Sequence, residues 1–469
     1  MKRNAAILFI LLAFASRLNA QLRPSEKIDS VFASVKGLTA TSVKIIDADN
    51  GAVIYARNPN KRVVPASTVK LFTTAAALDF LGKDFPLSVK ILARSLPENG
   101  TIGGDLVIKG FSNPFFTSAG LDSFAAEIYA SGVRKIAGDI IGDDSYLDNR
   151  YFHENWVRRE RSEVSVPPVS ALILDNNEIT LKFIPVPDKK KKYEFRFEPP
   201  SEFYDVNFSA RVTGKYAVPT IKIRTAPKKI TVNISGKIKA RKRAYSYKAH
   251  ADNPPLFVAN LLYERLKEKG VEINGEPKAG KSDEKTVTLC EIKTTLEKAI
   301  EKADKESDNF IAELLLKTLG AEYCACEGSA FYGIQAIYDF AERKNISMRN
   351  VEIVDGSGIS RYNRLTAEAV AELLSAMYDD AENFNVFYSS LAAAGTDGTL
   401  EERLTGFGLK NNFHGKTGTL NGVSALSGYF TAQSGKNVIV SILMNFNRYG
   451  AEYWREIQDE IIVYVTTGY

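Results

Sequence analysis

The segment NNFHGKTGTLNGVSALSGYF, residues 411–430, constrains the fold most, because its tripeptide GKT has two incompatible interpretations. In a phosphate-binding P-loop, G-x-x-x-x-G-K-[ST], the first glycine would stand where this chain has Lys410. A lysine lacks the backbone freedom that a phosphate cradle requires. The residues that follow alternate like a strand and do not resemble a helix. The P-loop is therefore excluded, and the alternative is a β-strand that presents Lys416 to a cleft. That alternative predicts partner motifs elsewhere.

The first partner motif is STVK, residues 67–70, an S-x-x-K inside the segment PASTVKLFTTAAALDFLG. Pro65 at the start and Gly82 at the end predict a helix, and the apolar composition predicts its burial. The spacing i, i+3 places Ser67 and Lys70 on one helix face. A lysine desolvated in apolar surroundings can lose its proton near neutral pH and serve as the base for a serine nucleophile. Taken alone this motif is weak evidence, since any solvated helix can carry it.

The second partner motif is SDN, residues 307–309, at the start of another apolar segment. Ser, Asp and Asn are also ordinary helix N-caps, so the motif has an equally good structural explanation. In KTG, residues 416–418, a strand lysine that faces a cleft can hold a carboxylate and polarise Ser307. Gly418 would let another backbone segment approach closely. Each motif is common alone, but the three in this order, each on its expected element, indicate a serine acyl-enzyme.

Regular elements are predicted near both ends of the chain. We expect a helix over residues 26–35 and a β-hairpin over 41–58 around its Asp-Asn-Gly turn. Near the other end, LNGVSALSGYF and NVIVSILMN, joined by SGKN, predict an antiparallel pair. The last segment, residues 450–468, has a single apolar helical stripe, which should pack on that sheet; the stripe consists of Trp454, Ile457, Ile461 and Val465.

Residues 178–250 are strand-like and strongly basic. They hold eighteen Lys and Arg against six Asp and Glu, a net charge of +12, whereas the whole chain carries +5. Such a surface attracts anionic polymers. A run of like charges is more often a solvated face, and strands dominate this region, not the aromatic platforms typical of nucleic-acid binding. We therefore favour the solvated face and expect no nucleic-acid partner.

Cysteine and histidine are too few for a metal site. The three cysteines, Cys290, Cys324 and Cys326, cannot form a closed disulfide framework, and we expect isolated buried thiols. The C-A-C spacing is wrong for zinc. The histidines are His153, His250 and His414, and no H-E-x-x-H is present. We expect no metal and no organic cofactor, and we assign His414 no catalytic role.

Residues 1–20, MKRNAAILFILLAFASRLNA, have a basic start, a short apolar run and a small residue at the end. This is typical of a secretory signal peptide, with cleavage expected before Gln21. The apolar run is short for a membrane span, and no later segment is long and apolar enough for one. We expect export to the periplasm or cell envelope, without a transmembrane anchor.

Across almost the whole chain after residue 20, the sequence resembles the class C low-molecular-mass penicillin-binding proteins. These are the D-alanyl-D-alanine carboxypeptidase/endopeptidases of the peptidase S13 family. The similar segments are PASTVKLFTTAAAL, GGDLVIKG, GDDSYLD, SDNFIAELLLK, VDGSGISRYNRLTA, LAAAGTDGTLEERL and GKTGTLNGVSALSGYF.

The resemblance implies an α/β (α+β) fold class, in which a β-lactamase/transpeptidase-like antiparallel sheet is covered by helices and carries two nested, strand-rich inserted domains. The catalytic domain would comprise residues 21–87 and 286–469. The first inserted domain would comprise 88–177 and 251–285, with the basic region 178–250 nested inside it.

The resemblance also implies a role for each motif residue. Ser67 would be the acylated nucleophile, with Lys70 as its general base. Ser307 and Lys416 would relay the proton to the leaving group, while Asn309 holds the substrate amide. The terminal carboxylate would bind Thr417 and Thr419, beside Gly418, and the backbone N–H groups of Ser67 and Thr419 would form the oxyanion hole.

Some family members grip the free end of a diaminopimelate side chain with an aspartate and an arginine. The matching residues here are Asp143, or its neighbour Asp144, and Arg361. A turn residue and a surface charge explain them equally well. The chain departs from the family at residues 112–114, Ser-Asn-Pro, where a Gly-Asp-Pro is usual; the residues present still suit a turn.

These features predict an exported serine hydrolase of peptidoglycan stem peptides that β-lactam antibiotics would acylate. Two alternatives remain open: a β-lactamase or serine esterase of the same fold, and a non-catalytic cell-wall-binding protein. The basic region leaves an anionic envelope polymer open as a further partner.

Overall fold

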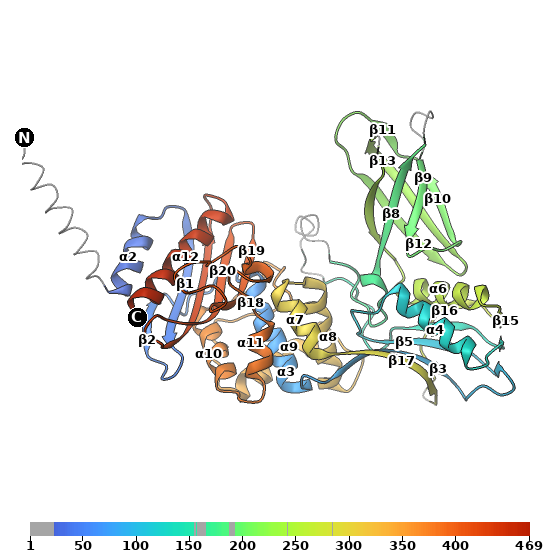
Figure 1. Ribbon diagram of the computed structural model, residues 1–469, viewed down its shortest axis with the longest axis horizontal. Helices are drawn as coiled ribbons and strands as arrows, with labels where there is room; N and C mark the ends of the chain where they lie inside the picture. The colour runs from blue at the N-terminus through green and yellow to red at the C-terminus, as the bar shows by residue number, and fades with distance from the viewer. Residues whose placement is uncertain (1–22, 154–155, 157–165, 187–192, 242, 284) are drawn as a thin grey trace, which may run out of the picture. The chain divides into compact units, whose positions relative to one another are not determined.

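The computed structural model describes residues 23–469, except 154–155, 157–165, 187–192, 242 and 284 (Figure 1). The predicted signal peptide lies outside the described residues. Within them, no helix has the length and apolar character that crossing a bilayer would require. The chain forms two compact units. Unit 1 comprises residues up to 80, 300–312 and 337–469, and unit 2 comprises 81–299 and 313–336.

Unit 1 is built on a six-stranded antiparallel sheet that joins the two ends of the chain. Its strand order is β18-β19-β20-β21-β1-β2, so β1 from the start of the chain pairs with β21 from near its end. The strands are β1 (Leu38–Asp47), β2 (Val53–Arg57), β18 (Ala392–Ala393), β19 (His414–Leu420), β20 (Val423–Thr431) and β21 (Asn437–Phe446). Both predicted hairpins are confirmed.

The two faces of this sheet are covered by different helices, as the alternation of strand side chains requires. Val43 and Ile45 of β1 belong to a core cluster with α2 (Pro24–Ser34) and α12 (Ala451–Gly468). These two helices lie side by side (Figure 1). The predicted apolar stripe of α12 is buried in that cluster.

Side chains of β1 that point the other way meet α10 (Ala367–Tyr378). The Ser42 hydroxyl accepts the Ala367 N–H at 2.9 Å, and the Lys44 ammonium pairs with Glu368 at 3.0 Å.

The predicted buried helix is confirmed with one difference at its start. Residues Ala66–Val69 form a 3₁₀ turn, η1, and the α-helix α3 begins at Lys70 and ends at Leu81. Ala66 has φ +50°, in the left-handed region that disfavours a side chain, so the chain turns sharply before the helix. Ser67 therefore lies in a tight turn and Lys70 in the first turn of α3.

Further helices follow in the second half of the chain. They are α7 (Leu296–Lys305), α8 (Asn309–Cys324), α9 (Ala330–Arg343) and α11 (Phe384–Ser390). The first three cross a boundary between the two units along the chain. In α7, the buried residues Leu296, Ala299, Ile300 and Ala303 follow helical spacing, which gives the helix one buried stripe.

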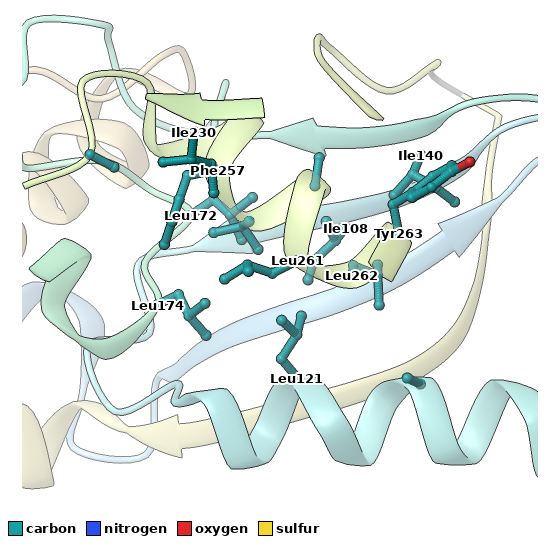
Figure 2. Close-up of a cluster of buried hydrophobic side chains, with 14 of the residues drawn as sticks. Ile108, Leu121, Ile140, Leu172, Leu174, Ile230, Phe257, Leu261, Leu262 and Tyr263 are labelled. Atoms are coloured by element: carbon teal, nitrogen blue, oxygen red, sulfur yellow. The ribbon is translucent and has the colours of Figure 1, made fainter. Parts of the chain in front are cut away.

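Unit 2 contains a mixed five-stranded sheet in the order β16-β7-β5-β3-β17 and a small parallel sheet, β15-β6-β4. Their strands are β3 (Pro86–Ala93), β4 (Thr101–Ile102), β5 (Leu106–Phe111), β6 (Lys135–Ile136), β7 (Ile140–Asp143), β15 (Glu272–Ile273), β16 (Pro277–Ala279) and β17 (Val287–Thr295). Figure 2 shows Phe257, Leu261 and Leu262 of α6 (Pro254–Glu268) among buried residues of β5, β7 and α4 (Ser118–Ala130).

The basic region of unit 2 is entirely strands and turns where it is described. Three strands pair as β14-β8-β9, and β13 pairs with β10, β11 and β12. These strands are β8 (Glu178–Pro185), β9 (Tyr193–Glu198), β10 (Tyr204–Phe208), β11 (Arg211–Thr213), β12 (Pro219–Ala226), β13 (Lys229–Lys239) and β14 (Tyr245–His250). Aromatic side chains point inward around Phe183, whereas the charged residues alternate with them on the outside.

The predicted fold class is confirmed: the protein is a mixed α and β structure whose first unit is an antiparallel sheet between helices. The boundaries predicted for two nested domains within residues 88–285 stay a prediction. The residues at 112–114 suit the predicted turn, because the Asn113 Oδ1 accepts a hydrogen bond from the Phe115 N–H at 3.0 Å, two residues further along the chain.

The prediction of isolated buried thiols is wrong for two of the three cysteines. Cys324 and Cys326 form a disulfide at the end of α8. Ala325 between them has φ +50°, so the chain reverses and brings the two side chains together, a geometry that sequence spacing did not reveal. Cys290 is a free, half-buried thiol.

Candidate active site

The predicted nucleophile and base meet in unit 1. Lys70 is fully buried, and its Nζ lies 3.1 Å from the Ser67 Oγ. It also lies 2.7 Å from the Asn309 Oδ1 and 2.7 Å from the Ser357 carbonyl oxygen. A neutral amine has two N–H donors and one lone pair, so it can serve both oxygens and still accept the serine proton. The packing therefore suits Lys70 as the base that activates Ser67.

The strand that carries KTG passes directly beside the nucleophile turn. A Cβ atom added at Gly418 would lie 2.8 Å from the Pro65 carbonyl oxygen and 3.1 Å from the Ser67 backbone nitrogen. Only a residue without a side chain allows β19 and η1 to approach this closely. The expectation for Gly418 agrees with this geometry.

Lys416 is also fully buried, on β19. Burial, together with repulsion from Lys70, lowers the pKa of Lys416 to about 7, and attraction to Asp304 opposes that fall. Its ammonium donates to the Thr417 carbonyl oxygen at 3.1 Å. No hydrogen bond joins it to Ser307 among the described residues, so the relay expected between them stays a prediction.

The SDN motif both caps a helix and contacts the candidate active site, so both interpretations of its sequence apply. The Asp308 carboxylate accepts the Ile311 N–H at 3.0 Å and caps α8, which is the structural role. Ser307 has φ +57°, and this bend precedes the first helical residue, Asn309. Because Asp308 caps the helix, the Asn309 side chain does not have to, and its Oδ1 accepts a hydrogen bond from Lys70.

The loop at residues 355–363 contributes contacts from outside the three motifs. The Asp355 carboxylate accepts the N–H groups of Gly358 at 2.8 Å and Ser360 at 2.7 Å. A Cβ at Gly358 would lie 2.0 Å from the Ala66 carbonyl oxygen, so the loop presses against η1. Sequence similarity marked this stretch as DGSG, but only the packing reveals that it brings the Ser357 carbonyl oxygen to Lys70.

The predicted carboxylate-binding threonines lie on the open side of β19. Thr419 is exposed, and its hydroxyl accepts a hydrogen bond from the Arg455 guanidinium of α12 at 3.3 Å. The half-exposed Thr417 donates to the Thr399 hydroxyl at 2.8 Å. Arg361 donates to the Asn421 carbonyl oxygen at 2.6 Å, at the turn that follows β19. Arg455 was not predicted, because nothing in the spacing of α12 distinguishes it from a surface arginine.

Asp143 and Asp144 lie in unit 2, whereas Arg361 lies in unit 1. Asp143 is fully buried, with its carboxylate 3.0 Å from the Lys109 ammonium and bonded to the N–H groups of Ser145 and Ser282. Although burial opposes it, hydrogen bonding from these serines lowers the pKa of Asp143. Asp144 accepts the hydroxyls of Tyr151 and Ser170, each at 2.9 Å, and burial raises its pKa.

His414, the residue left without a role, packs flat on Tyr388 with ring centroids 4.2 Å apart. Burial lowers its pKa. Across the described residues, no group of three His, Cys, Asp or Glu side chains is arranged to hold a metal ion.

One buried carboxyl near the lysines was missed entirely. Asp304 of α7 is fully buried, and burial raises its pKa to about 6 even though Lys416 and Lys70 attract its anionic form. A signal for it existed: Asp304 follows Leu296 and Ile300 at intervals of four, on the buried stripe of α7. The charged run around it, EKADKE, resembled a solvated helix face instead.

The chain matches known proteins over nearly all its length. The profile of the family described as D-Ala-D-Ala carboxypeptidase 3 (S13) matches residues 25–467. The D-alanyl-D-alanine carboxypeptidase of Actinomadura sp. (strain R39) is 27% identical over 410 residues, covering 84% of this chain and 76% of that protein. The D-alanyl-D-alanine carboxypeptidase DacB of Haemophilus influenzae is 25% identical over 400 residues, covering 82% and 81%.

The crystal structure of penicillin binding protein 4 (dacB) from Haemophilus influenzae has a similar fold. It superposes with a TM-score of 0.78 at 22% identity, over 93% of this chain and 98% of that one. The resemblance seen in the motifs is confirmed by the family match, which extends beyond the motifs to both units. The protein belongs to the D-Ala-D-Ala carboxypeptidase 3 (S13) family.

Proposed function

We propose that this protein is an exported serine-type peptidase of peptidoglycan stem peptides. It hydrolyses a terminal D-Ala-D-Ala bond, a D-Ala-diaminopimelate crosslink, or both, through an acyl-enzyme on Ser67. The observation that carries the proposal is the buried Lys70 Nζ, 3.1 Å from the Ser67 Oγ. Family membership supports the substrate class.

In the proposed acylation step, the neutral Lys70 amine takes the Ser67 proton as the Oγ attacks the carbonyl carbon of the scissile bond. The backbone N–H groups of Ser67 and Thr419 stabilise the oxyanion. The carbon–nitrogen bond then breaks, and the proton held by Lys70 passes through Ser307 and Lys416 to the leaving amine, which returns Lys70 to its neutral form. Water next attacks the ester; Lys70 takes a proton from that water and gives it to the Ser67 Oγ as the ester bond breaks, which releases the shortened peptide and free Ser67.

Two features support export. The predicted signal peptide at residues 1–20 directs secretion. The Cys324–Cys326 disulfide is of a kind that persists in oxidising compartments and is rare in the reducing cytosol.

Mass spectrometry of muropeptides after incubation with the purified protein tests the proposed function. Conversion of pentapeptides to tetrapeptides would demonstrate carboxypeptidase activity, and conversion of crosslinked dimers to monomers would demonstrate endopeptidase activity. An unchanged muropeptide profile, from a preparation that penicillin acylates stoichiometrically, would argue for the β-lactamase or esterase alternative. Release of the bound penicillin within seconds would favour that alternative, and release over hours would favour a peptidase.

We propose that Arg455 and Thr419 together bind the terminal carboxylate of the substrate, because the guanidinium already contacts the threonine hydroxyl. Replacing Arg455 by alanine is expected to raise KM for D-Ala-D-Ala peptides by about tenfold, since a charge-assisted hydrogen bond contributes roughly 1.5–3 kcal/mol. kcat should change little.

A substrate amidated at its terminal carboxylate is the control for Arg455. The wild-type enzyme should bind this substrate poorly, and Arg455→Ala should weaken its binding no further. An equal loss on both substrates would mean that Arg455 acts on the structure of β19 and not on the carboxylate.

A grip on the free end of a diaminopimelate side chain by Asp143, or its neighbour Asp144, and Arg361 stays a proposal, and at Asp143 the ammonium of that free end would have a competitor. The Lys109 ammonium already neutralises the buried Asp143 carboxylate. A substrate ammonium would have to share or displace that partner. Replacing Lys109 by methionine should therefore increase the preference for substrates with a free side-chain amine, if Asp143 is a ligand.

The basic strands, β8 to β14, support the proposal of a second partner, which would be an anionic polymer of the cell envelope. Lys182 of β8 stands directly opposite Arg196 of β9, and both are exposed. Like charges in this position destabilise strand pairing, so the surface holds positive charge that folding does not require. We expect the double variant Lys182→Glu/Arg196→Glu to elute from a polyphosphate column at clearly lower salt than wild type.

The matched control for the basic strands, Lys61→Glu/Lys83→Glu, changes the net charge equally at exposed sites elsewhere. It should elute close to wild type. Equal shifts for the two double variants would indicate a response to net charge alone and would contradict a binding surface on the strands.

A further inference from the structure

The Arg455 guanidinium is held by a hydroxyl and not by a carboxylate. Among the described residues its hydrogen-bond partner is the Thr419 Oγ1, at 3.3 Å. A guanidinium that the protein leaves without a counter-charge suits an anionic group of a substrate. The arginine side chain is long, and it loses rotational freedom when it binds a ligand. It therefore binds an anion best where the backbone that carries it is already held in place.

Arg403 holds the turn of α12 that carries Arg455. The Arg403 Nε and one terminal nitrogen lie 3.3 and 2.6 Å from the two carboxylate oxygens of Asp459. The same terminal nitrogen donates to the Gln458 Oε1 and to the Arg455 carbonyl oxygen, each at 3.3 Å. The Arg403 side chain is only 13% exposed, and Gln458 is fully buried. Because Asp459 neutralises its charge, Arg403 ties α12 in place and is not itself available to a substrate carboxylate.

Thr399 belongs to the same short segment, residues 397–403, and contacts the other side of the carboxylate site. It lies in the 3₁₀ turn η3 (Gly398–Leu400), and its Oγ1 is 2.8 Å from the Thr417 Oγ1. A hydroxyl has one proton, which rotates freely, and two lone pairs. When Thr417 turns its proton towards a bound carboxylate, its lone pair can accept the proton of Thr399. A hydroxyl that accepts one hydrogen bond becomes a stronger donor in the next.

The backbone of the segment is fixed before either side chain acts. The Asp397 carboxylate accepts the Ala393 N–H at 2.7 Å and pairs with the Lys305 ammonium at 3.2 Å. A Cβ atom added at Gly398 would lie 2.4 Å from the Lys305 carbonyl oxygen, so the segment packs directly on the end of α7. Leu400 is fully buried in the core cluster beneath the sheet. Thr399 and Arg403 therefore extend from a backbone that is anchored on two sides.

We propose that Thr399 and Arg403 are positioning residues for the substrate carboxylate. Thr399 orients the Thr417 hydroxyl, and Arg403 fixes the turn of α12 that presents Arg455. This inference rests on the acyl-enzyme function and on the carboxylate site proposed above. It adds one segment outside the three motifs that sets the preference of the site for a substrate with an anionic end.

The test compares acylation by benzylpenicillin, which has a free carboxylate, with acylation by its methyl ester, which has none. The ratio of the two second-order rate constants measures recognition of the carboxylate. Both constants come from the same preparation, so the fraction of folded enzyme cancels in the ratio. Thr399→Val removes the hydroxyl at similar volume and should lower the ratio about fivefold, as the loss of one hydrogen bond predicts. Thr399→Ser, which keeps the hydroxyl, should retain the wild-type ratio.

Arg403→Met should lower the same ratio, because Arg455 is then less well held. The fall should not exceed that of Arg455→Ala, about tenfold, since Arg403 acts only through that residue. Asp459→Ala removes the same ion pair from its other end and should lower the ratio in the same way. Arg343→Met is the matched control, because it removes an arginine–aspartate pair of 2.7 Å elsewhere in unit 1 and should leave the ratio at the wild-type value.

Double variants separate positioning from a general effect on the structure. Adding Arg403→Met to Arg455→Ala should lower the ratio no further, and the same should hold when Thr399→Val is added to Thr417→Val. A fall that is equally large with and without the partner residue would mean that the segment does not act through it, and would overturn the inference.

A wild-type ratio in Thr399→Val or in Arg403→Met would overturn the role of that residue and leave the acyl-enzyme function intact, since wild type would still be acylated. A wild-type protein that benzylpenicillin does not acylate would instead remove the proposed function itself. One set of rate measurements therefore distinguishes the two failures.

Discussion

Replacing Ser67 by alanine is expected to abolish covalent labelling of the protein by penicillin and all release of D-alanine. The reason is that the proposed ester to the substrate would form on the Ser67 Oγ, which lies 3.1 Å from the Lys70 Nζ. The free thiol Cys290 is no substitute, because burial and the nearby Glu127 raise its pKa to about 12, which keeps it protonated. Intact-protein mass spectrometry measures the loss as the absence of the penicilloyl adduct.

Ser34→Ala is the matched control for Ser67→Ala. Ser34 lies at the end of α2 in the same unit, where its hydroxyl donates to the Val31 carbonyl oxygen at 2.8 Å. This variant should be labelled at the wild-type rate. A stoichiometric adduct on Ser67→Ala would require a different nucleophile and would refute the acyl-enzyme proposal for this site.

Replacing Lys70 by methionine is expected to slow acylation by about 10²–10⁴-fold, the usual contribution of a general base. Methionine is similar in length and apolar, so it can fill the buried space. The Asn309 Oδ1 and the Ser357 carbonyl oxygen would lose their partner, but the cost of burying an amine would disappear as well. Stopped-flow acylation by a chromogenic β-lactam gives the rate, and thermal unfolding gives the stability.

Lys70→Arg distinguishes a base from a fixed positive charge. Arginine cannot lose its proton at any pH that the protein tolerates, so this variant should be as slow as Lys70→Met. An arginine variant that retained a tenth or more of the wild-type rate would mean that Lys70 acts through its charge, and the base would have to be sought elsewhere.

Some residues of the candidate site could be predicted from the sequence. They are the ones whose proposed chemistry requires a certain residue type at a fixed spacing along the chain. Ser67 and Lys70 are one helical turn apart, so their contact follows from the sequence alone. Gly418 was predictable for a similar reason, because a strand that runs beside a nucleophile turn cannot carry a side chain there. The sheet and its hairpins followed from alternation and turn residues.

The parts that could not be predicted depend on the meeting of distant segments. Asp304 interacts with Thr74 of α3 and Lys416 of β19 only in the folded chain, and in the sequence most of its neighbours are charged residues typical of a solvated helix. Arg455 reaches Thr419 from the last helix, and the Ser357 carbonyl oxygen reaches Lys70 from a loop. The disulfide required a left-handed Ala325 that no local rule favours. The motifs therefore predicted the candidate reacting atoms, and tertiary packing brings further groups into contact with them.

The pairing of β1 with β21 has a consequence for the life of the enzyme before it is complete. Ser67 follows β1 and β2 closely in the sequence, whereas Lys416 and Gly418 lie late in the chain on β19, which β20 and β21 separate from β1 in the sheet. A ribosome makes the nucleophile turn first and must then make both parts of unit 2 before the strand that completes the site. Until that strand is in place, Ser67 lacks both the Thr419 N–H of the proposed oxyanion hole and the proposed proton donor, Lys416. The proposed hydrolysis would therefore be absent from every unfinished chain, and the order of the segments along the chain would be enough to delay it.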